Sequence, residues 1–378
     1  RKYNEEMINI LIFDMSIYRP YKNILHYECS YIENINININ LIKKRFLSDV
    51  KIISVLDKFS NTVFSSECEL YSLNLTNWVE QFREIKPSIF FVESVWDSVK
   101  SKINLSSYNN KSYNIFNTIL KYCRDNDIIP IFWNKEDGIN YSKFIWIASL
   151  FENIYTTDNN CVEKYKKDAP NSNVYVLQFA VNPLLHNPFK KKISKDIIFA
   201  GRWYYGNDFI DRRNDMNLIF DDISFLKTKK IDIYDRNFVI EKNKKSFPDK
   251  FNSFLKESVE YNLLCNLYKE YIIMYNINSV NNSCTMFSRR VLESIACKTF
   301  ILSTYSPAYS KLDLECIYSA SSKIEFKNKT NYILDNYMIL QNNIHNDFIK
   351  IYKNHKYSDR LVTVCNNNDM QVTKKYFK

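Results

Sequence analysis

The chain has 378 residues, 46% of them hydrophobic, which is enough for two domains with proper cores, and no apolar run of about 18 residues that would cross a membrane. Nine scattered cysteines without a C-x-x-C pair, together with only four histidines, argue against a disulfide framework or a zinc site and favour reduced thiols in a cytoplasmic setting. The net charge of +10 suits an anionic partner, but the lysines are dispersed and no DNA- or RNA-binding signature is present, so we expect no nucleic acid partner.

Short apolar runs alternate with amphipathic stretches along the first half of the chain. The near-continuous apolar run at 7–15 predicts a buried parallel strand rather than a signal peptide, and residues 23–48 are expected to be mostly helical. Further strands are expected at 50–56, 88–92, 127–133, 153–155 and 174–179, and helices at 78–85, 116–123, 141–151 and 160–168. This repeated order predicts a parallel α/β sheet in a first domain at 1–182.

The same rhythm begins again after the prolines and lysines of 182–192. Strands are expected at 196–200, 230–234, 272–276, 299–303 and 323–326, helices at 210–220, 262–270 and 329–353, and a charged loop at 237–258. The second domain is placed at 183–335, followed by a helical tail at 336–378 that can cross back to the N-terminal domain.

The stretch 275–307 has the features of an anion site. A strand ends at Asn276, a polar loop follows, and a helix then has an apolar face formed by Val291, Leu292, Ile295 and Ala296. Ser283 or Thr285 is expected to cap this helix. A helix N-terminus behind a strand attracts anions through its N–H groups and its dipole.

Three charged residues fall off the apolar face of that helix. Arg289 and Arg290 match phosphate oxygens, and Glu293 can accept hydrogen bonds from a ribose diol, so the stretch suits a sugar nucleotide. The alternative is a surface helix in which Arg289 and Glu293 form an ordinary i, i+4 ion pair. A second feature favours the ligand: Gly201 and Arg202 follow the strand at 196–200, where a glycine admits a ligand to the backbone and an arginine can meet a diphosphate.

The sequence pattern of these segments resembles that of a known protein family. Asn276-Ile277-Asn278, Thr285, Arg289-Arg290, Leu292-Glu293, Ala296-Cys297 and Ser306-Pro307 form the pattern. It is similar to that of CgeB-like glycosyltransferases of the GT-B fold, except that Lys298 replaces a glycine. Further short segments, each only weakly similar to these glycosyltransferases, occur in the expected order over 7–360.

The resemblance implies an α/β fold of two Rossmann-like parallel-sheet domains facing each other across a cleft. It also implies metal-independent transfer of a sugar from a nucleotide sugar, UDP- or GDP-linked, to a glycan or protein acceptor, with no other cofactor. The acceptor would bind the N-terminal domain. The candidate donor-binding residues are Gly201, Arg202, Tyr234, Asn278, Asn282, Ser283, Thr285, Arg289, Arg290 and Glu293.

Glycosyl transfer that inverts configuration needs a base for the acceptor hydroxyl. Glu136 and Asp137, at the tip of the strand at 127–133, are the first candidates, and Glu93 and His26 are weaker ones. Asp137 could instead cap the following helix. The anomeric outcome stays open.

The residues Asp125-Asn126-Asp127 have the letters of the D-x-D metal site of the rival GT-A fold, but they precede a strand and are expected to form a helix-to-strand turn.

Two further interpretations remain. A decayed transferase could recognise a glycan or nucleotide without catalysis, given Lys298 and the lack of an obvious base. A scaffold on an anionic membrane would need a basic amphipathic helix, for which 344–356 supplies basic residues beside Phe348 and Ile351.

Overall fold

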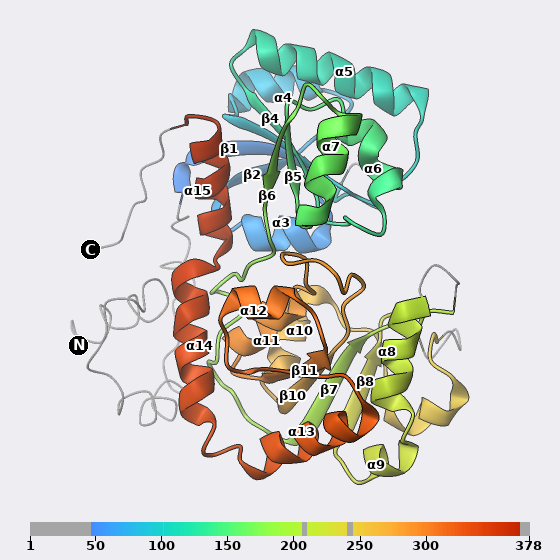
Figure 1. Ribbon diagram of the computed structural model, residues 1–378. Helices are drawn as coiled ribbons and strands as arrows, with labels where there is room; N and C mark the ends of the chain where they lie inside the picture. The colour runs from blue at the N-terminus through green and yellow to red at the C-terminus, as the bar shows by residue number, and fades with distance from the viewer. Residues whose placement is uncertain (1–46, 101, 206–209, 240–244, 371–378) are drawn as a thin grey trace, which may run out of the picture. The chain divides into compact units, whose positions relative to one another are not determined.

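The computed structural model describes residues 47–370 except 101, 206–209 and 240–244 (Figure 1). The strand expected at 7–15, most of the helical segment expected at 23–48, and His26 lie outside the described residues. What the structure describes contains two six-stranded sheets, and every strand pair in them is parallel.

The first sheet has the strand order β2-β1-β3-β4-β5-β6. Its strands are β1 (Leu47–Val55), β2 (Cys68–Ser72), β3 (Ile89–Glu93), β4 (Ile129–Asn134), β5 (Asn153–Thr156) and β6 (Asn173–Val176). Its helices are α3 (Lys58–Phe64), α4 (Trp78–Ile85), α5 (Asn110–Asp125), α6 (Tyr141–Ala148) and α7 (Val162–Asp168), with a 3-10 turn η3 (Asn159–Cys161) before α7. The strands and helices predicted here are confirmed, whereas β2 and α3 were not predicted.

Sequence patterns explain the best-predicted of these elements. Every residue of β3 is buried, as expected for an apolar strand whose two faces are both covered by helices. Helix α5 buries Phe116, Ile119, Leu120 and Cys123, which recur at helical spacing, and the Asn109 side chain caps it by accepting a hydrogen bond from the Ser112 N–H.

The second sheet has the order β12-β11-β10-β7-β8-β9. Its strands are β7 (Lys195–Gly201), β8 (Ile231–Asp235), β9 (Leu255–Lys256), β10 (Tyr271–Asn276), β11 (Phe300–Thr304) and β12 (Ile317–Ala320). The helices around it are α8 (Ile210–Phe220), α9 (Ile223–Lys227), α10 (Tyr261–Tyr268), α11 (Arg290–Ala296), α12 (Ala308–Leu312), α13 (Lys323–Asp335) and α14 (Gln341–Asn354). Counted from β7, this is the 3-2-1-4-5-6 strand order of the Rossmann fold.

The strand expected at 323–326 is wrong, because these residues form the first turn of α13. The Ser322 side chain accepts a hydrogen bond from the Glu325 N–H, so a Ser-x-x-Glu capping signature starts a helix here. The strand that completes the sheet is β12, which lies just before it.

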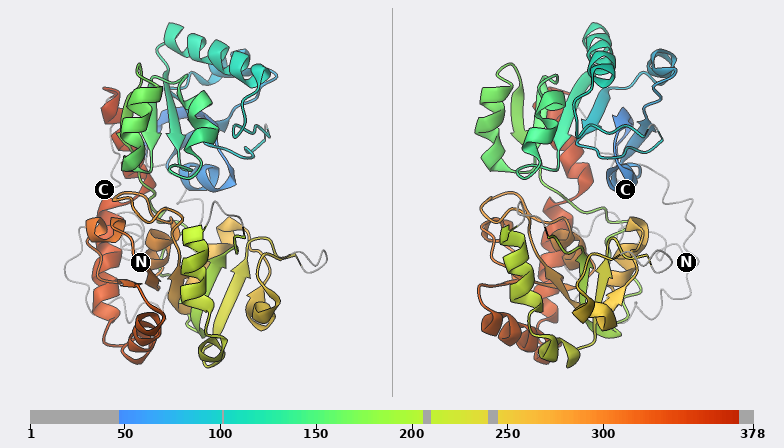
Figure 2. Two further views of the ribbon diagram at one scale, coloured as in Figure 1. Left: turned by 45° about the vertical axis from the view of Figure 1, so that its right-hand side comes forward. Right: turned by 90° about the vertical axis from the view of Figure 1, so that its right-hand side faces the viewer.

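The chain forms two compact units. The C-terminal unit contains Ala180–Asn282 and Phe287–Lys356, and the N-terminal unit contains the described residues 47–179, the short loop Ser283–Met286 and residues 357–370. Accordingly, α14 lies with the C-terminal unit, whereas α15 (Tyr357–Asn367) lies with the N-terminal unit (Figures 1 and 2).

No helix among the described residues has the length and apolar character needed to cross a membrane. Phe348 and Ile351 of α14 are buried, so the apolar residues required for the membrane-scaffold interpretation are already covered within the C-terminal unit. The eight cysteines in the described part of the chain are all free thiols.

Candidate functional site

The order of the second sheet reverses between β7 and β10. These strands are parallel neighbours, but the chain continues from β7 toward β8 on one side and from β10 toward β11 on the other. In open α/β sheets ligands bind beyond the carboxyl ends of the strands at such a reversal. Gly201 ends β7, and a Cβ placed on it would lie 3.8 Å from Nη2 of Arg290, which follows β10 along the chain. The guanidinium of Arg290 therefore lies at the reversal.

Two more arginines lie in the same unit near Arg290. The ring of Tyr204 has the guanidinium of Arg202 4.1 Å from its centroid and that of Arg212 4.9 Å from it. Arg212 is buried and donates to the carbonyl of Ile277 at 2.9 Å. We call Arg202, Arg212 and Arg290 the arginine cluster.

Carboxylates of the described residues do not neutralise the positive charge of the arginine cluster. The pKa of Arg212 is lowered to about 10, chiefly by burial; the nearby charges of Arg290 and Arg202 act in the same direction, while Tyr204 and Asp215 oppose them. Burial likewise lowers the pKa of Arg290. Within the described residues no carboxylate forms an ion pair with a member of the cluster, and the Nε atoms of Arg202 and Arg212 are buried without a hydrogen-bond partner. Such a group of guanidiniums suits an anion with several oxygens.

A hydrogen-bonded turn fixes the loop that carries Arg202. The buried carboxylate of Asp235, at the end of β8, accepts from Oγ of Ser246 at 2.6 Å, and that Oγ accepts from the Trp203 N–H at 3.0 Å. The loops after β7 and β8 are thereby joined, which positions Arg202 next to the reversal.

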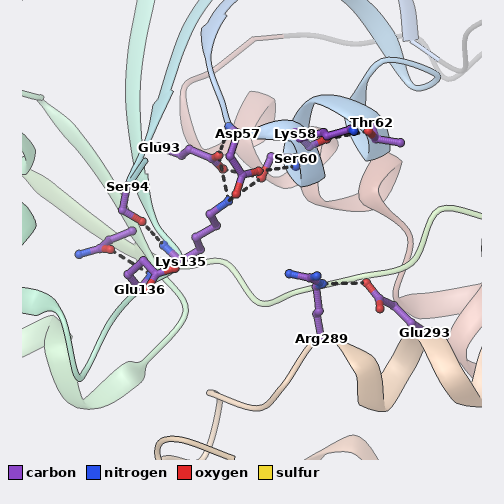
Figure 3. A network of polar contacts seen from close by, with 11 residues as sticks. Asp57, Lys58, Ser60, Thr62, Glu93, Ser94, Lys135, Glu136, Arg289 and Glu293 are labelled. Atoms are coloured by element: carbon purple, nitrogen blue, oxygen red, sulfur yellow. Dashed lines mark hydrogen bonds and ion pairs between the residues drawn. The ribbon is translucent and has the colours of Figure 1, made fainter. Parts of the chain in front are cut away.

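Helix α11 is buried on all sides rather than on one face. Glu293 is 0% exposed, so the expectation that it falls off a buried face is wrong. The alternative is wrong about a surface helix, although the Arg289–Glu293 ion pair that it predicted is present. Its carboxylate accepts from Oη of Tyr261 at 2.9 Å. It also pairs with Nε of Arg289 at 3.3 Å (Figure 3). His186 lies behind it, with Nε2 3.8 Å from the carboxylate, and burial lowers the pKa of that imidazole to about 4.

The predicted cap of this helix is also wrong. The N-cap of α11 is Arg289, without a side-chain cap, and Ser283 and Thr285 lie several residues before it. Ser283 Oγ accepts from the Met286 N–H at 2.9 Å, and Thr285 Oγ1 donates to the carbonyl of Thr157 at 3.0 Å. These two candidates therefore belong to the N-terminal unit.

The remaining donor candidates are dispersed. Asn278 is buried, and its Oδ1 accepts from the Ser288 N–H at 2.9 Å, which shapes the loop before Arg290. Asn282 is exposed. The hydroxyl of Tyr234 lies 3.3 Å from that of Tyr271, the first residue of β10, so it is directed toward the amino end of that strand.

The first sheet has its own reversal, between β1 and β3, and a charged network lies there. Asp57 follows β1, Glu93 ends β3 and Lys135 follows β4 (Figure 3). Nζ of Lys135 lies 2.5 Å from Oδ2 of Asp57 and 2.9 Å from Oε1 of Glu93. Ser60 Oγ donates to the other oxygen of Glu93 at 2.5 Å. We call Asp57, Glu93 and Lys135 the charged triad.

Burial raises the pKa of Glu93 to about 7, and the charge of Asp57 adds to this effect while Lys135 opposes it. The pKa of Lys135 is raised because the two carboxylates outweigh its burial, so the ammonium stays charged. Glu93 is 0% exposed and therefore does not present its carboxylate at the surface of the unit.

The other two acid candidates lie beside β4. Asp137 is buried and accepts from Thr156 Oγ1 at 2.6 Å and from Asn134 Nδ2 at 2.7 Å, and burial raises its pKa to about 7. The capping alternative for Asp137 is wrong, since Asn140 is the N-cap of α6. Glu136 is half-buried and accepts from Asn140 Nδ2 at 3.0 Å.

The helix-to-strand turn predicted for Asp125-Asn126-Asp127 is confirmed. Asp125 ends α5, Asn126 is its C-cap and Asp127 has a φ of 55° before β4 begins. Among the described residues no group of three or more His, Cys, Asp or Glu side chains could hold a metal ion.

Sequence reasoning missed three members of these two sites. Asp57 directly follows a predicted strand and Lys135 lies two residues after another, so the rule that strand tips carry ligands could have found both. Arg212 is on a helix, α8, and nothing in its local pattern marks it.

The fold with its two doubly wound sheets can be compared with known proteins. No protein-family model matches the sequence, and no curated protein matches it either. Solved structures do: HepE of Anabaena in complex with UDP-glucose has a TM-score of 0.52 and 9% identity, covering 84% of this chain and 91% of that chain. A mutant of BGT of phage T4 in complex with UDP-glucose has a TM-score of 0.51 and 12% identity, covering 85% of this chain and 99% of that chain.

BGT of phage T4 in complex with UDP and Mn²⁺ matches with a TM-score of 0.50 and 12% identity, over 85% of this chain and 99% of that chain. At these identities the likeness concerns the fold alone. The chain has the GT-B fold, with two Rossmann-like parallel sheets, as predicted. Its closeness to CgeB-like proteins in particular stays a prediction.

Proposed function

We propose that this protein is a glycosyltransferase that moves a sugar from a nucleotide sugar to a hydroxyl acceptor. The observation that carries the proposal is the arginine cluster at the reversal of the second sheet. Arg202 and Arg290 would hold the diphosphate of the donor, and Gly201 would admit it to the end of β7, where a side chain would approach Arg290. Arg212 would support Arg202 through the shared ring of Tyr204.

The same residues suit the chemistry of the transfer. When the bond between the sugar carbon and the phosphate oxygen breaks, negative charge develops on the departing nucleoside diphosphate. Guanidiniums already fixed at that place stabilise this charge without reorganising, which is a large contribution in a site that excludes water. We therefore propose that a metal ion is not required, and that chelation by EDTA leaves turnover unchanged. Turnover that depends on added Mn²⁺ would contradict this part.

UDP sugars are the first donors to test, because the similar structures of HepE and BGT were solved with UDP or UDP-glucose. GDP sugars are the second group, since nothing in the arginine cluster reads the base. We propose a glycan or protein hydroxyl as the acceptor, bound by the N-terminal unit.

The proposal is tested by measuring thermal stability and turnover with one nucleotide panel. A ligand that binds only the folded protein raises its stability, by about 2.7 kcal/mol at a hundred times its Kd. UDP or GDP should raise the melting temperature well above the effect of UMP, GMP or the nucleosides, and one nucleotide sugar should be hydrolysed or transferred. Equal effects of nucleoside and nucleoside diphosphate would overturn the diphosphate site.

A second candidate, a binding module without catalysis, is favoured by one observation. Glu93 and Asp137, two of the acids that the sequence offers as a base, are both buried. Tight nucleotide sugar binding without hydrolysis or transfer, across a panel of acceptors, would support that candidate.

A further inference from the structure

We propose that Asp57 is the base that takes the proton of the acceptor hydroxyl, and that Lys135 and Glu93 are its positioning residues. The inference rests on the proposed function and deepens it, because it assigns a role to the reversal of the first sheet. Open parallel sheets bind ligands at such a reversal, and the charged triad lies where β1, β3 and β4 end.

Of the charged triad, only Asp57 reaches the surface. Its side chain is 32% exposed, whereas the side chains of Lys135 and Glu93 are 6% and 0% exposed. The carboxylate that an acceptor could touch is therefore Asp57. Glu93, the candidate that the sequence suggested at this place, lies behind it.

The surroundings hold the Asp57 carboxylate in one orientation. Oδ1 accepts from the Ser60 N–H at 2.9 Å, which caps α3, and Oδ2 faces Nζ of Lys135 at 2.5 Å. The Asp57 N–H in turn donates to Glu93 Oε1 at 2.6 Å. A base must be fixed within hydrogen-bond reach of the proton it takes, and these contacts fix it from both ends.

Lys135 does not pair with Asp57 alone. Lys135 is shared between two carboxylates, so the three groups carry one net negative charge when Glu93 is ionised. A lysine paired with Asp57 alone would cancel its charge and weaken it as a base. The buried Glu93 therefore shares the positive charge of Lys135 with Asp57.

The proposed transfer is a displacement at the sugar carbon. The acceptor oxygen forms a bond to the sugar carbon as the bond from that carbon to the phosphate oxygen breaks. The acceptor proton moves to the Asp57 carboxylate, and the electron pair of the broken bond leaves with the nucleoside diphosphate. Asp57 then returns its proton to water. Nothing is oxidised or reduced, and no further reactant is needed.

Glu93 makes this step sensitive to pH. Lys135 and Asp57 are the charged groups that face it, and Ser60 donates to it. Because burial raises the pKa of Glu93 to about 7, it loses its charge as the pH falls below neutrality, and Lys135 then neutralises Asp57 alone. We expect turnover to fall on the acid side of neutrality.

The test compares the variants Asp57→Asn, Asp97→Asn and Glu136→Gln with the unaltered chain. Asparagine retains the cap of α3, since it caps helices as well as aspartate does. We expect Asp57→Asn to lower kcat by about 100-fold or more, the usual contribution of a general base, with an unchanged Kd for UDP. Asp97 is an exposed carboxylate on the loop after β3, so Asp97→Asn is the matched control and should retain normal turnover.

The outcomes separate this inference from the proposed function. If the unaltered chain turns over no nucleotide sugar, the proposed function fails. If it does turn over but Asp57→Asn does so equally well, or if only Glu136→Gln is inactive, the assignment of Asp57 fails. A second measurement addresses Glu93: the variant Glu93→Gln should remove the acid limb of the kcat profile, a change that loss of a purely structural ion pair would not produce.

Discussion

Among single residues, Arg290 should matter most for the donor, because its guanidinium lies beside the end of β7. A hydrogen bond to a charged group contributes about 1.5–3 kcal/mol, so Arg290→Ala should weaken UDP binding by roughly 10- to 100-fold. Arg290→Lys should recover only part of this, since lysine lacks the planar fork of donors. Isothermal titration calorimetry measures both. The control is Arg124→Ala, which removes only an exposed ion pair with Glu152, and a loss of affinity there as large as in Arg290→Ala would contradict the assignment.

A variant of Glu293 tests whether this carboxylate binds the ribose of the donor or orients Arg289. The sequence places it on the ribose, yet its carboxylate is occupied by Tyr261 and Arg289, so we propose that it orients Arg289 instead. Glu293→Gln should then lower the free energy of unfolding by about 1–3 kcal/mol and weaken UDP and inorganic pyrophosphate to the same small extent. A selective loss of UDP affinity, with pyrophosphate unaffected, would restore the ribose assignment, since only UDP carries a ribose.

Asp137 gives the protein a stability that depends on pH. Its folded pKa of about 7 lies above the ordinary value of 3.8, so the folded state holds a proton that the unfolded state has already lost between these two values. Stability should therefore decrease as the pH rises through this range, by about 1.4 kcal/mol per pH unit at most, and level off above pH 7. Urea denaturation of the unaltered chain and of Asp137→Asn measures this, because the variant lacks the proton. Parallel pH profiles of the two proteins would rule the contribution out.

At the scale of an element, the end of α11 explains the glycine that the family pattern expects. Lys298 has a φ of 57°, in the left-handed region, and Thr299 N–H donates to the Ser294 carbonyl at 2.9 Å while Lys298 N–H donates to that of Ile295 at 2.8 Å. These are the two bonds of a Schellman motif, whose left-handed position favours glycine.

The prediction for this position compares two variants. Lys298→Gly should be more stable than Lys298→Ala by about 1 kcal/mol, because both lose the lysine side chain but only alanine retains the left-handed strain. Differential scanning calorimetry of the pair gives the difference. An alanine variant as stable as the glycine variant would show that the backbone is not strained here.

Elements with strong patterns were predictable, and short or half-exposed ones were not. The continuous apolar run of β3 and the helical spacing of α5 each identify one structure. By contrast, β2 has a mixed burial pattern over five residues, and α3 follows β1 after a short turn, so neither has a clear period. The cap at Ser322 could have been predicted from the sequence, but the alternating apolar and charged residues of 323–326 resembled a short strand.

For the whole molecule, residues that follow the C-terminal unit complete the N-terminal one. Tyr357 is 0% exposed, and its ring lies edge-on to Phe64 at 5.0 Å and to Phe59 at 6.2 Å. Tyr357→Ala should cost about 3–5 kcal/mol, as other large aromatic truncations do. Hydrogen exchange should show lost protection in β1 and β3 and little change in β7 and β10. The control is Tyr332→Ala, which is 49% exposed and should alter neither unit.

The sequence could indicate both sheets but only part of each site. Strand order follows from pairing between distant segments, and the reversals that locate the sites become visible only when β10 is found beside β7 and β3 beside β1. Gly201 and Arg202 were named from a strand tip and Arg290 from the helix that follows the polar loop, and the structure brings Gly201 and Arg290 together. Ser283 and Thr285 were named as caps of that helix, yet both bond to residues of the N-terminal unit, because a loop need not pack against the element that follows it in sequence.

The placement of α15 has a consequence for synthesis of the protein. Arg360 donates to the carbonyls of Gln178 and Phe179, and Tyr357 fills the space beside Phe64, so the earliest described strands lack part of their interior until this helix leaves the ribosome. The C-terminal sheet is translated in between and needs none of those residues. The C-terminal unit should therefore be able to fold first, and the N-terminal unit should stay incompletely packed until α15 has been synthesised.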